Sequence, residues 1–111
     1  MVEVFTTESF DRWLRKLKDR HGRLRILERI DQLAHGNPGD VKPVGQGVLE
    51  LRLTYGPGYR VYYAQNDRVV MLLHGGDKST QQHDIERAHQ LAAEWRSEEK
   101  EDGEDGQVHP V

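Results

Sequence analysis

Residues 55–63 read YGPGYRVYY, and the expected fold of the chain can be worked out starting from this stretch. Its centre, Gly56-Pro57-Gly58, predicts a tight turn, because glycine permits positive φ and proline fixes φ near the value that turns need. Apolar residues recur at every second position on both sides of the turn, a period that is typical of strands with one buried face. These residues are Leu49, Leu51, Leu53, Tyr59, Val61 and Tyr63. The stretch therefore predicts a β-hairpin.

The register of this hairpin brings two arginines together. A hairpin closed symmetrically around the turn sets Arg52 opposite Arg60, and Glu50 opposite Tyr62, on the face away from the leucines. Two like charges in a direct cross-strand pair are destabilising unless an acid neutralises them or an anion binds to them. Two interpretations follow, a surface ion network with Glu50 and a phosphate site, and spacing alone does not decide between them.

Helices are expected before the hairpin. A short β-prone segment at residues 2–5 precedes Thr6-Thr7, which are good N-cap residues. Apolar residues at helical spacing then predict one helix that ends near Gly22 and a second helix over residues 26–34. The two helices are expected to form a hairpin, and the proline- and glycine-rich stretch 37–47 to be a loop.

A third strand and a closing helix are expected after the hairpin. Residues 68–74 are apolar at consecutive positions, which indicates a central strand covered on both faces, ended by Gly75-Gly76. Ser79 and Gln82 form a weak capping box before the last helix. The order β-α-α-β-β-β-α predicts an α+β fold, in which an antiparallel meander sheet packs on one side against an N-terminal helix hairpin and a C-terminal helix.

Charge is distributed unevenly along the 111 residues. The chain carries a formal net charge of −3, but residues 97–111 hold six acidic residues and one lysine. The first 96 residues therefore hold 15 basic and 13 acidic groups, a net charge of +2 that permits an anionic partner. We expect one domain over residues 1–96 and a disordered acidic tail over 97–111. The tail raises the hypothesis that it weakly covers the arginine face, and a solvated tail is the simpler alternative.

Several classes of protein are not expected. The chain has no cysteine, so it offers neither a disulfide framework nor a cysteine-type zinc site, and no other metal-binding motif is found. The start MVEVF does not resemble a signal peptide, and the longest apolar run, Val69 to Leu73, is far too short to cross a membrane. We expect a cytoplasmic protein with no membrane partner, no cofactor and no metal.

Two longer stretches carry a resemblance to a known family. GVLELRLTYGPGYRVYY (47–63) and VVMLLHGGDKSTQQHDIERA (69–88) resemble the RelE/ParE superfamily of bacterial toxins, in particular its HigB-like branch of addiction module killer proteins related to phage Gp49. The resemblance runs from about Val4 to Trp95. It implies a RelE-like fold and the toxin of a type II toxin–antitoxin system. Such a toxin cleaves mRNA, often on the ribosome, and is held inactive by a cognate antitoxin of the HigA or RelB kind.

The resemblance also implies site residues. Arg52 of E-L-R, Arg60 of the hairpin and Lys78 of G-G-D-K correspond to basic positions with which related toxins hold and activate the scissile phosphate. The chain departs from many ribosome-dependent members, which are more basic and carry a catalytic tyrosine or histidine near the C-terminus. Here an acidic tail with His109 stands in that place. The general acid and base therefore stay unassigned.

The chemistry of the residues adds further candidates. RNA supplies its own nucleophile, the 2′-hydroxyl, so cationic groups that stabilise the transition state suffice for a metal-independent endoribonuclease. Lys78 is expected either in this role or in a salt bridge to Asp77 or Asp84. His83, in the first turn of the last helix, is a candidate acid or base, and His74 is expected to be structural.

Aromatic and acidic residues complete the predicted substrate-binding set. Tyr55 in the turn and Tyr62 on the arginine face are expected to be free to stack on an unpaired base, with Glu50 beside them. Tyr59 and Tyr63 are expected in the core. Two other functions remain open: a ParE-like inhibitor of DNA gyrase without catalysis, and a module that only binds its antitoxin. Cleavage of RNA or blocked supercoiling by the purified protein separates the first two.

Overall fold

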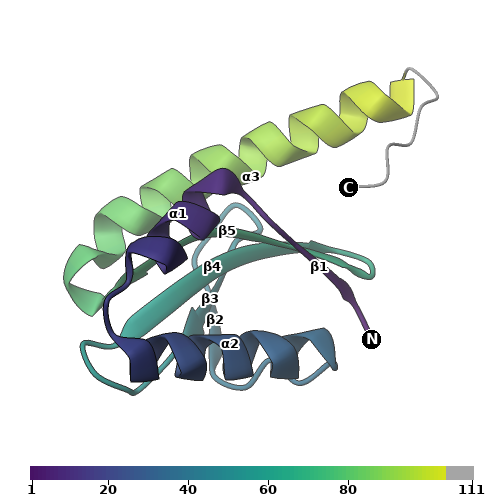
Figure 1. Ribbon diagram of the computed structural model, residues 1–111. Helices are drawn as coiled ribbons and strands as arrows, with labels where there is room; N and C mark the ends of the chain where they lie inside the picture. Colours follow the sequence, from purple (N-terminus) through teal and green to yellow (C-terminus); the bar gives the residue numbers. More distant parts are fainter. Residues whose placement is uncertain (105–111) are drawn as a thin grey trace.

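The computed structural model describes the backbone of residues 1–104 and the side chains of residues 1–99. Within this part the chain forms one five-stranded sheet and three α-helices (Figure 1). In chain order the elements are β1 (Glu3–Thr6), α1 (Glu8–Lys16), α2 (Arg20–Ala34), β2 (Val41–Pro43), β3 (Leu49–Arg52), β4 (Tyr59–Asn66), β5 (Val69–Asp77), the short 3₁₀ helix η1 (Lys78–Thr80) and α3 (Gln81–Glu104). The α+β fold is confirmed.

The sheet has the strand order β1-β5-β4-β3-β2. Only β1 and β5 run parallel, and the other neighbours are antiparallel. The predicted register of the hairpin is confirmed, since Arg52 pairs with Arg60 and Glu50 pairs with Tyr62. The strand β2 was not expected, because residues 37–47 have the composition of a loop. It pairs with the outer edge of β3 for three residues.

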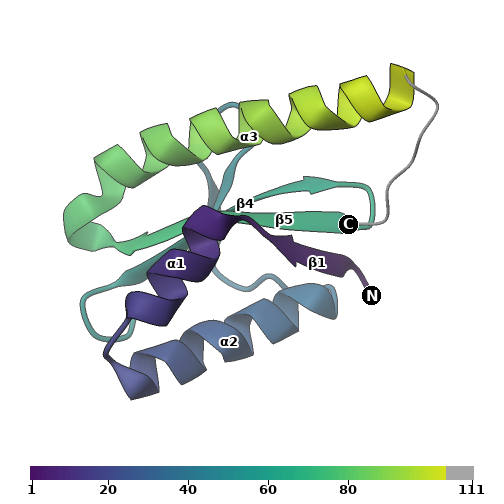
Figure 2. The same cartoon turned by 45° about the horizontal axis from the view of Figure 1, so that its top comes forward.

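Helices cover both faces of the sheet, which corrects the prediction that all helices lie on one side. Figures 1 and 2 show α1 and α2 on one face and α3 on the other. Phe10 and Ile26 pack with Val70 and Leu72 of β5 in the first core. The second core, which contains α3, includes the alternate β5 residues Met71 and Leu73. Because β5 is apolar at consecutive positions, it serves both cores, as expected for a central strand.

The first helix ends earlier than its apolar pattern predicts. α1 stops at Lys16, and Gly22 lies inside α2. The reason is Asp19, whose side chain accepts a hydrogen bond of 2.9 Å from the Gly22 N–H and so caps the N-terminus of α2.

β5 continues through the two glycines that were expected to end it. A Cβ at Gly75 would lie 2.1 Å from the Trp13 ring, and one at Gly76 would lie 1.8 Å from Asp84 Oδ2. The glycines therefore let α1 and α3 approach the sheet closely. Asp77, not Ser79, begins the next turn, because its side chain accepts a bond of 2.8 Å from the Ser79 N–H.

α3 extends to Glu104 and so crosses the predicted boundary between residues 96 and 97. Residues 97–104 are rich in glutamate, which favours helix once the preceding turns are formed. Residues 105–111, with His109, lie outside the described part, so the predicted disorder of the tail stays a prediction. Among the residues described, no helix is long and apolar enough to span a membrane.

Candidate functional site: a cationic cleft at the hairpin turn

A cleft of about 320 Å³ lies beside the turn between β3 and β4. Three cationic side chains line it, those of Arg52, Arg60 and Lys78, and so does one acid, Asp40. The remaining lining residues are Leu53, Thr54, Gly56, Pro57 and Gly58. The structure therefore brings together three predicted cations from two separate stretches of the sequence, residues 47–63 and 69–88.

Arg60 holds the turn by hydrogen bonds to its backbone. Its Nη1 donates to the carbonyl oxygens of Gly58 (3.1 Å), Tyr59 (3.2 Å) and Leu53 (3.4 Å). The Arg60 side chain is only 8% exposed. Gly58 has a φ of 79°, a backbone conformation that amino acids other than glycine adopt only with strain. A glycine at this position therefore lets the chain close over the Arg60 guanidinium. Arg60 thus places its charge at the floor of the cleft and also holds the turn.

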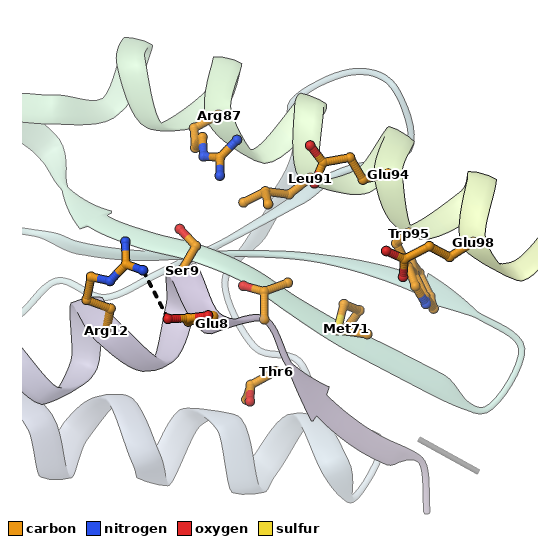
Figure 3. A pocket seen from close by; sticks show the side chains of 11 residues that line it. Thr6, Glu8, Ser9, Arg12, Met71, Arg87, Leu91, Glu94, Trp95 and Glu98 are labelled. Carbon is orange, nitrogen blue, oxygen red and sulfur yellow. Dashed lines mark hydrogen bonds and ion pairs between the residues drawn. The ribbon is translucent and has the colours of Figure 1, made fainter. Parts of the chain in front are cut away.

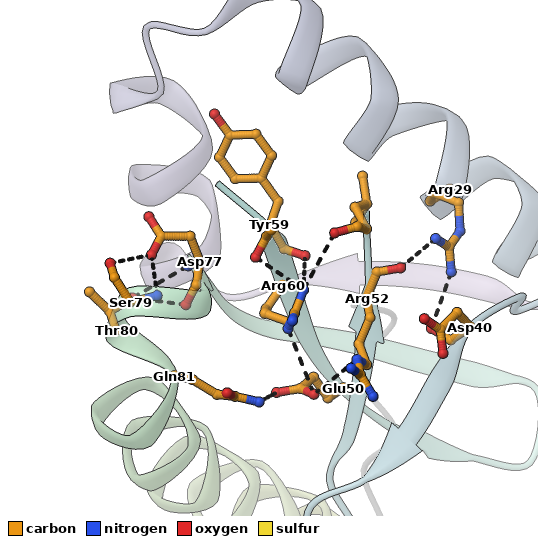
Figure 4. Close-up of polar contacts among 12 residues, drawn as sticks. Arg29, Asp40, Glu50, Arg52, Tyr59, Arg60, Asp77, Ser79, Thr80 and Gln81 are labelled. Carbon is orange, nitrogen blue, oxygen red and sulfur yellow. Dashed lines mark hydrogen bonds and ion pairs between the residues drawn. The ribbon is translucent and has the colours of Figure 1, made fainter. Parts of the chain in front are cut away.

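Glu50 pairs with both facing arginines and offsets one of their two charges (Figure 4). Its Oε1 lies 3.9 Å from the Nε of both Arg52 and Arg60. Gln81 donates a hydrogen bond of 2.8 Å to the other carboxylate oxygen. The Glu50 side chain has no exposed surface, so it does not line the cleft in which the sequence analysis expected it. The ion network with Glu50 is therefore present but buried, whereas the phosphate site stays a prediction, for which the cleft lined by Arg52 and Arg60 is the place.

Tyr62 is not where the sequence analysis expected it. The ring is fully buried in the core beneath α3, because helices cover both faces of the sheet, and it offers no surface for stacking. Its hydroxyl has no hydrogen-bond partner among the described side chains. Burial, followed by the charge of Glu50, raises the pKa of this phenol above its usual range. Tyr59 and Tyr63 lie in the other core, as predicted.

Tyr55 is half-buried at the edge of the turn. The guanidinium of Arg25 lies over its ring at 5.3 Å from the centroid, a cation–π contact. A smaller cavity of about 200 Å³ includes both side chains and shares Leu53 and Thr54 with the cleft. Tyr55 therefore lies next to the three cations without lining the cleft.

Lys78 is exposed and directed to the cleft by η1. Within residues 1–99 it forms no ion pair, and the two acids proposed as its partners are engaged elsewhere. Asp77 accepts from Ser79, and Asp84 contacts His74 at 3.0 Å. The Lys78 ammonium is thus available to a ligand.

The histidines lie away from the three cations. His83 is exposed on α3 and does not line the cleft. His74 Nδ1 lies 2.8 Å from Ser9 Oγ, and its Nε2 lies 3.0 Å from Asp84 Oδ1. These two contacts tie α1, β5 and α3 together, which is the structural role expected of His74. Among the described residues no cluster of three or more His, Asp or Glu side chains is arranged to hold a metal ion.

Asp40 is the cleft residue that sequence reasoning missed. Its carbonyl oxygen accepts from the Arg52 N–H at 3.0 Å and from Arg29 Nη2 at 3.3 Å, which fixes the backbone at this point. Its carboxylate forms no ion pair with another described residue. Asp40 lies in a loop without periodicity, and only the pairing of β2 with β3 brings it beside Arg52. The sequence contained no signal for this contact.

A second, larger cavity suits an anion less well. It measures about 460 Å³ and lies between the start of α1 and the face of α3 (Figure 3). Three glutamates and two arginines line it, and one of those arginines, Arg12, is paired with Glu8 at 3.1 Å. The cleft at the turn is therefore the better candidate for binding phosphate.

Comparison with known proteins identifies the family of the chain. The profile of the family described as Phage derived protein Gp49-like (DUF891) matches residues 12–94. An uncharacterised protein of Haemophilus influenzae is 50% identical over 94 residues, which cover 84% of this chain and 95% of that protein.

Two solved structures align with the chain at low sequence identity. A chain of the intact E. coli RelBE toxin–antitoxin complex aligns with a TM-score of 0.60 at 21% identity, over 69% of this chain and 96% of that one. The conserved hypothetical protein HP0894 of Helicobacter pylori aligns with a TM-score of 0.48 at 21% identity, over 71% and 97% of the two chains. The first of these likenesses establishes a RelE-like fold.

Proposed function

The chain belongs to the phage-derived Gp49-like family and has the RelE-like toxin fold, and we propose that it is the toxin of a type II toxin–antitoxin pair. The proposed activity of this toxin is that of an endoribonuclease acting on mRNA. The observation that carries the proposal is the cleft in which Arg52, Arg60 and Lys78 converge. Three cations around one small opening match a phosphodiester, whose charge increases in the transition state of cleavage.

The reaction uses the substrate's own nucleophile. The 2′-hydroxyl oxygen attacks the adjacent phosphorus, the bond to the 5′-oxygen breaks, and a cyclic 2′,3′-phosphate remains. Arg52 and Lys78 bind the non-bridging oxygens, and Arg60 adds positive charge from the floor of the cleft. The Asp40 carboxylate takes the proton of the 2′-hydroxyl, and the departing 5′-oxygen receives a proton from Lys78 or water.

An antitoxin is the proposed protein partner. The RelE-like structural neighbour comes from a toxin–antitoxin complex, which supports a partner of the RelB or HigA kind. A segment of such a partner laid over the cleft would block access of RNA to the three cations. Cleavage of mRNA by the purified protein, measured with and without ribosomes, distinguishes ribosome-dependent from ribosome-independent activity.

Arg52 and Lys78 are the positions that test the activity. Arg60 is unsuitable, because replacing it also removes hydrogen bonds to three carbonyl oxygens of the turn. We expect Arg52→Gln and Lys78→Gln each to lower the rate of RNA cleavage about 100-fold, the usual cost of losing one group that stabilises transition-state charge. Arg68→Gln, in the exposed turn after β4, is the matched control and should cleave normally.

The same variants are compared in bacteria by induced expression and mapping of new 5′ ends across the mRNA pool. Growth arrest with new ends that disappear in the two cleft variants supports a ribonuclease. Growth arrest without new ends contradicts it and redirects the search to DNA gyrase, whose supercoiling activity is then assayed. No growth arrest at all would indicate a module that only binds its antitoxin.

The role of Asp40 has an independent test. Asp40→Asn should slow cleavage by about 100-fold or more, the typical contribution of a positioned base. The same variant should bind a 2′-O-methyl RNA at least as tightly as the wild type, because a negative charge is lost beside the phosphate. Undiminished cleavage by Asp40→Asn would exclude it as the base.

A further inference from the structure

A second cationic cavity lies across the Gly56 turn from the cleft, and we propose that it binds the phosphate backbone of the RNA strand that flanks the cleaved bond. This inference rests on the proposed function and extends it to how the substrate is held. Five cations line the cavity, which measures about 630 Å³, together with Leu17. They are Arg15, Lys16, Lys18, Arg20 and Arg23, called the basic patch below. No carboxylate lines the cavity.

The charges of the basic patch are not compensated within the described part of the chain. Four of its side chains are exposed, and none of those four forms an ion pair or a side-chain hydrogen bond there. Arg23 is half-buried and donates to the Leu17 carbonyl oxygen. Asp19, in the middle of the patch in sequence, instead accepts from the Gly22 N–H and, at 2.8 Å, from the Tyr59 hydroxyl. Five like charges held in one concave surface repel each other, and bound anions relieve that repulsion.

The basic patch and the cleft lie on two sides of the same turn. Gly56 lines the cleft, and a Cβ built on it would lie 3.8 Å from Asp19 Oδ2. Asp19 is flanked in sequence by Lys18 and Arg20, which line the patch. Figure 1 shows the turn before β4 next to the start of α2. An RNA strand whose scissile phosphate lies in the cleft would therefore reach the basic patch by passing over this turn.

The chemistry of the patch favours a polyphosphate chain over an acidic protein segment. Protein interfaces have an apolar centre from which lysine is depleted, whereas Leu17 is the one apolar residue that lines this cavity. Affinity for single-stranded nucleic acid comes from such cations together with planar groups on which bases stack. The stacked pair of Arg25 and Tyr55, at 5.3 Å, lies beside the same turn and supplies planar surfaces.

The test compares binding of 2′-O-methyl RNA, which the proposed reaction cannot cleave, as oligomers of about 4 and about 14 nucleotides, near the site sizes of single-strand binders. One triple variant carries Lys16→Gln, Lys18→Gln and Arg20→Gln, all at exposed positions. The control carries Arg68→Gln, Arg87→Gln and Arg96→Gln and loses the same charge elsewhere.

For the long oligomer we expect about tenfold weaker binding by the patch variant. We also expect its plot of log affinity against log salt to be about 2 units shallower, from three lost phosphate contacts. The control should match the wild type.

Each outcome bears on the proposal separately from the ribonuclease activity, which is measured on unmodified RNA. Equal loss in the two triple variants would show a net-charge effect and overturn the proposal, as would wild-type affinity in the patch variant. Loss of binding to an acidic protein partner with RNA binding intact would assign the patch to that partner instead. A wild type that cleaves RNA but gains no affinity with oligomer length also overturns the inference and leaves the proposed function standing.

Discussion

A single buried carboxylate allows two arginines to face each other across the hairpin. Glu50 has no exposed surface and lies 3.9 Å from the Nε of Arg52 and of Arg60. Such an arrangement is not a large source of stability, because removing Glu50 and Arg60 from water costs nearly as much as the attraction between the charges returns. Its consequence is positional, since it fixes both guanidinium groups at the cleft before any substrate arrives.

Replacing Glu50 by glutamine should leave two uncompensated cations. We expect a loss of about 3–5 kcal/mol in the free energy of unfolding, the usual cost of breaking a buried charge pair. Urea denaturation measures it. Glu8→Gln, which removes an exposed pair with Arg12, is the control and should show no measurable loss. A stable Glu50→Gln protein would show that the arginines do not depend on this acid.

Asp19 should make stability depend on pH. Its hydrogen bond from the Gly22 N–H, and then that from the Tyr59 hydroxyl, lower the pKa of the carboxyl. Because the pKa in the folded state lies below that of the unfolded chain, about 3.9, the stabilisation is present above that pH and is lost as pH falls through the folded value. Burial and Asp19 raise the pKa of Tyr59 to about 12, so the phenol stays protonated throughout this range.

The variant Asp19→Asn keeps a good N-cap residue but loses the charge. Its melting temperature should fall below that of the wild type at neutral pH, and the two curves should converge in acid below the ordinary pKa of aspartate, about 3.9. Thermal denaturation of both proteins across a pH series measures this difference in melting temperature. A difference in melting temperature that stays constant with pH would contradict the charge argument.

At the scale of elements, β5 is the strand that joins the sheet to the segment carrying Lys78. It pairs with β1 and β4, serves both cores, and continues through Gly75 and Gly76 to Asp77, after which η1 presents Lys78. Its two glycines are needed for the close approach of α1 and α3 rather than for a turn. The position of Lys78 thus depends on how closely these helices pack on the strand.

Gly75→Ala should cost about 1–3 kcal/mol, because its Cβ would lie 2.1 Å from the Trp13 ring. In a Trp13→Leu background the smaller side chain leaves room, and the same substitution should cost clearly less. A double-mutant cycle from urea denaturation measures this coupling. An equal cost in the two backgrounds would show that the glycine acts through the backbone alone.

At the scale of the whole molecule, the charges are separated in space. The hairpin turn and the segment between α1 and α2, whose residues line the cleft and the basic patch, lie at the end of the sheet where α3 begins, and α3 extends away from that end (Figure 2). Ser97 lies sixteen residues beyond Gln81 in α3, about 24 Å along the helix axis. This distance exceeds the screening length of about 8 Å at physiological ionic strength.

Deleting residues 97–111 should change RNA affinity by less than about twofold at 0.15 M salt, where the charges of residues 97–104 at the far end of α3 are screened from the cleft. At low salt the truncated chain should bind more tightly, because its net charge rises from −3 to +2. Fluorescence titration at both salt concentrations tests this. A several-fold gain at 0.15 M salt would support the hypothesis that the acidic tail covers the cleft.

The hairpin and its register follow from the sequence alone, since alternation with a period of two excludes a slip by one residue and closure around the Gly56-Pro57-Gly58 turn selects among the pairings that remain. It also predicted the central place of β5, because only a strand covered on both faces is apolar at consecutive positions. Arg52, Arg60 and Lys78 were selected before the structure, from charge pairing and from motif resemblance.

The surroundings of these residues depend instead on tertiary packing. Helices on both faces bury Tyr62 and Glu50, and β2 brings Asp40 to the cleft. The segment before α2 gathers the basic patch beside the same turn. None of these contacts is local, and each depends on which sheet face a helix covers or which edge a short strand joins. Local periodicity specifies which residues share a face, whereas packing of the whole chain determines what lies against that face.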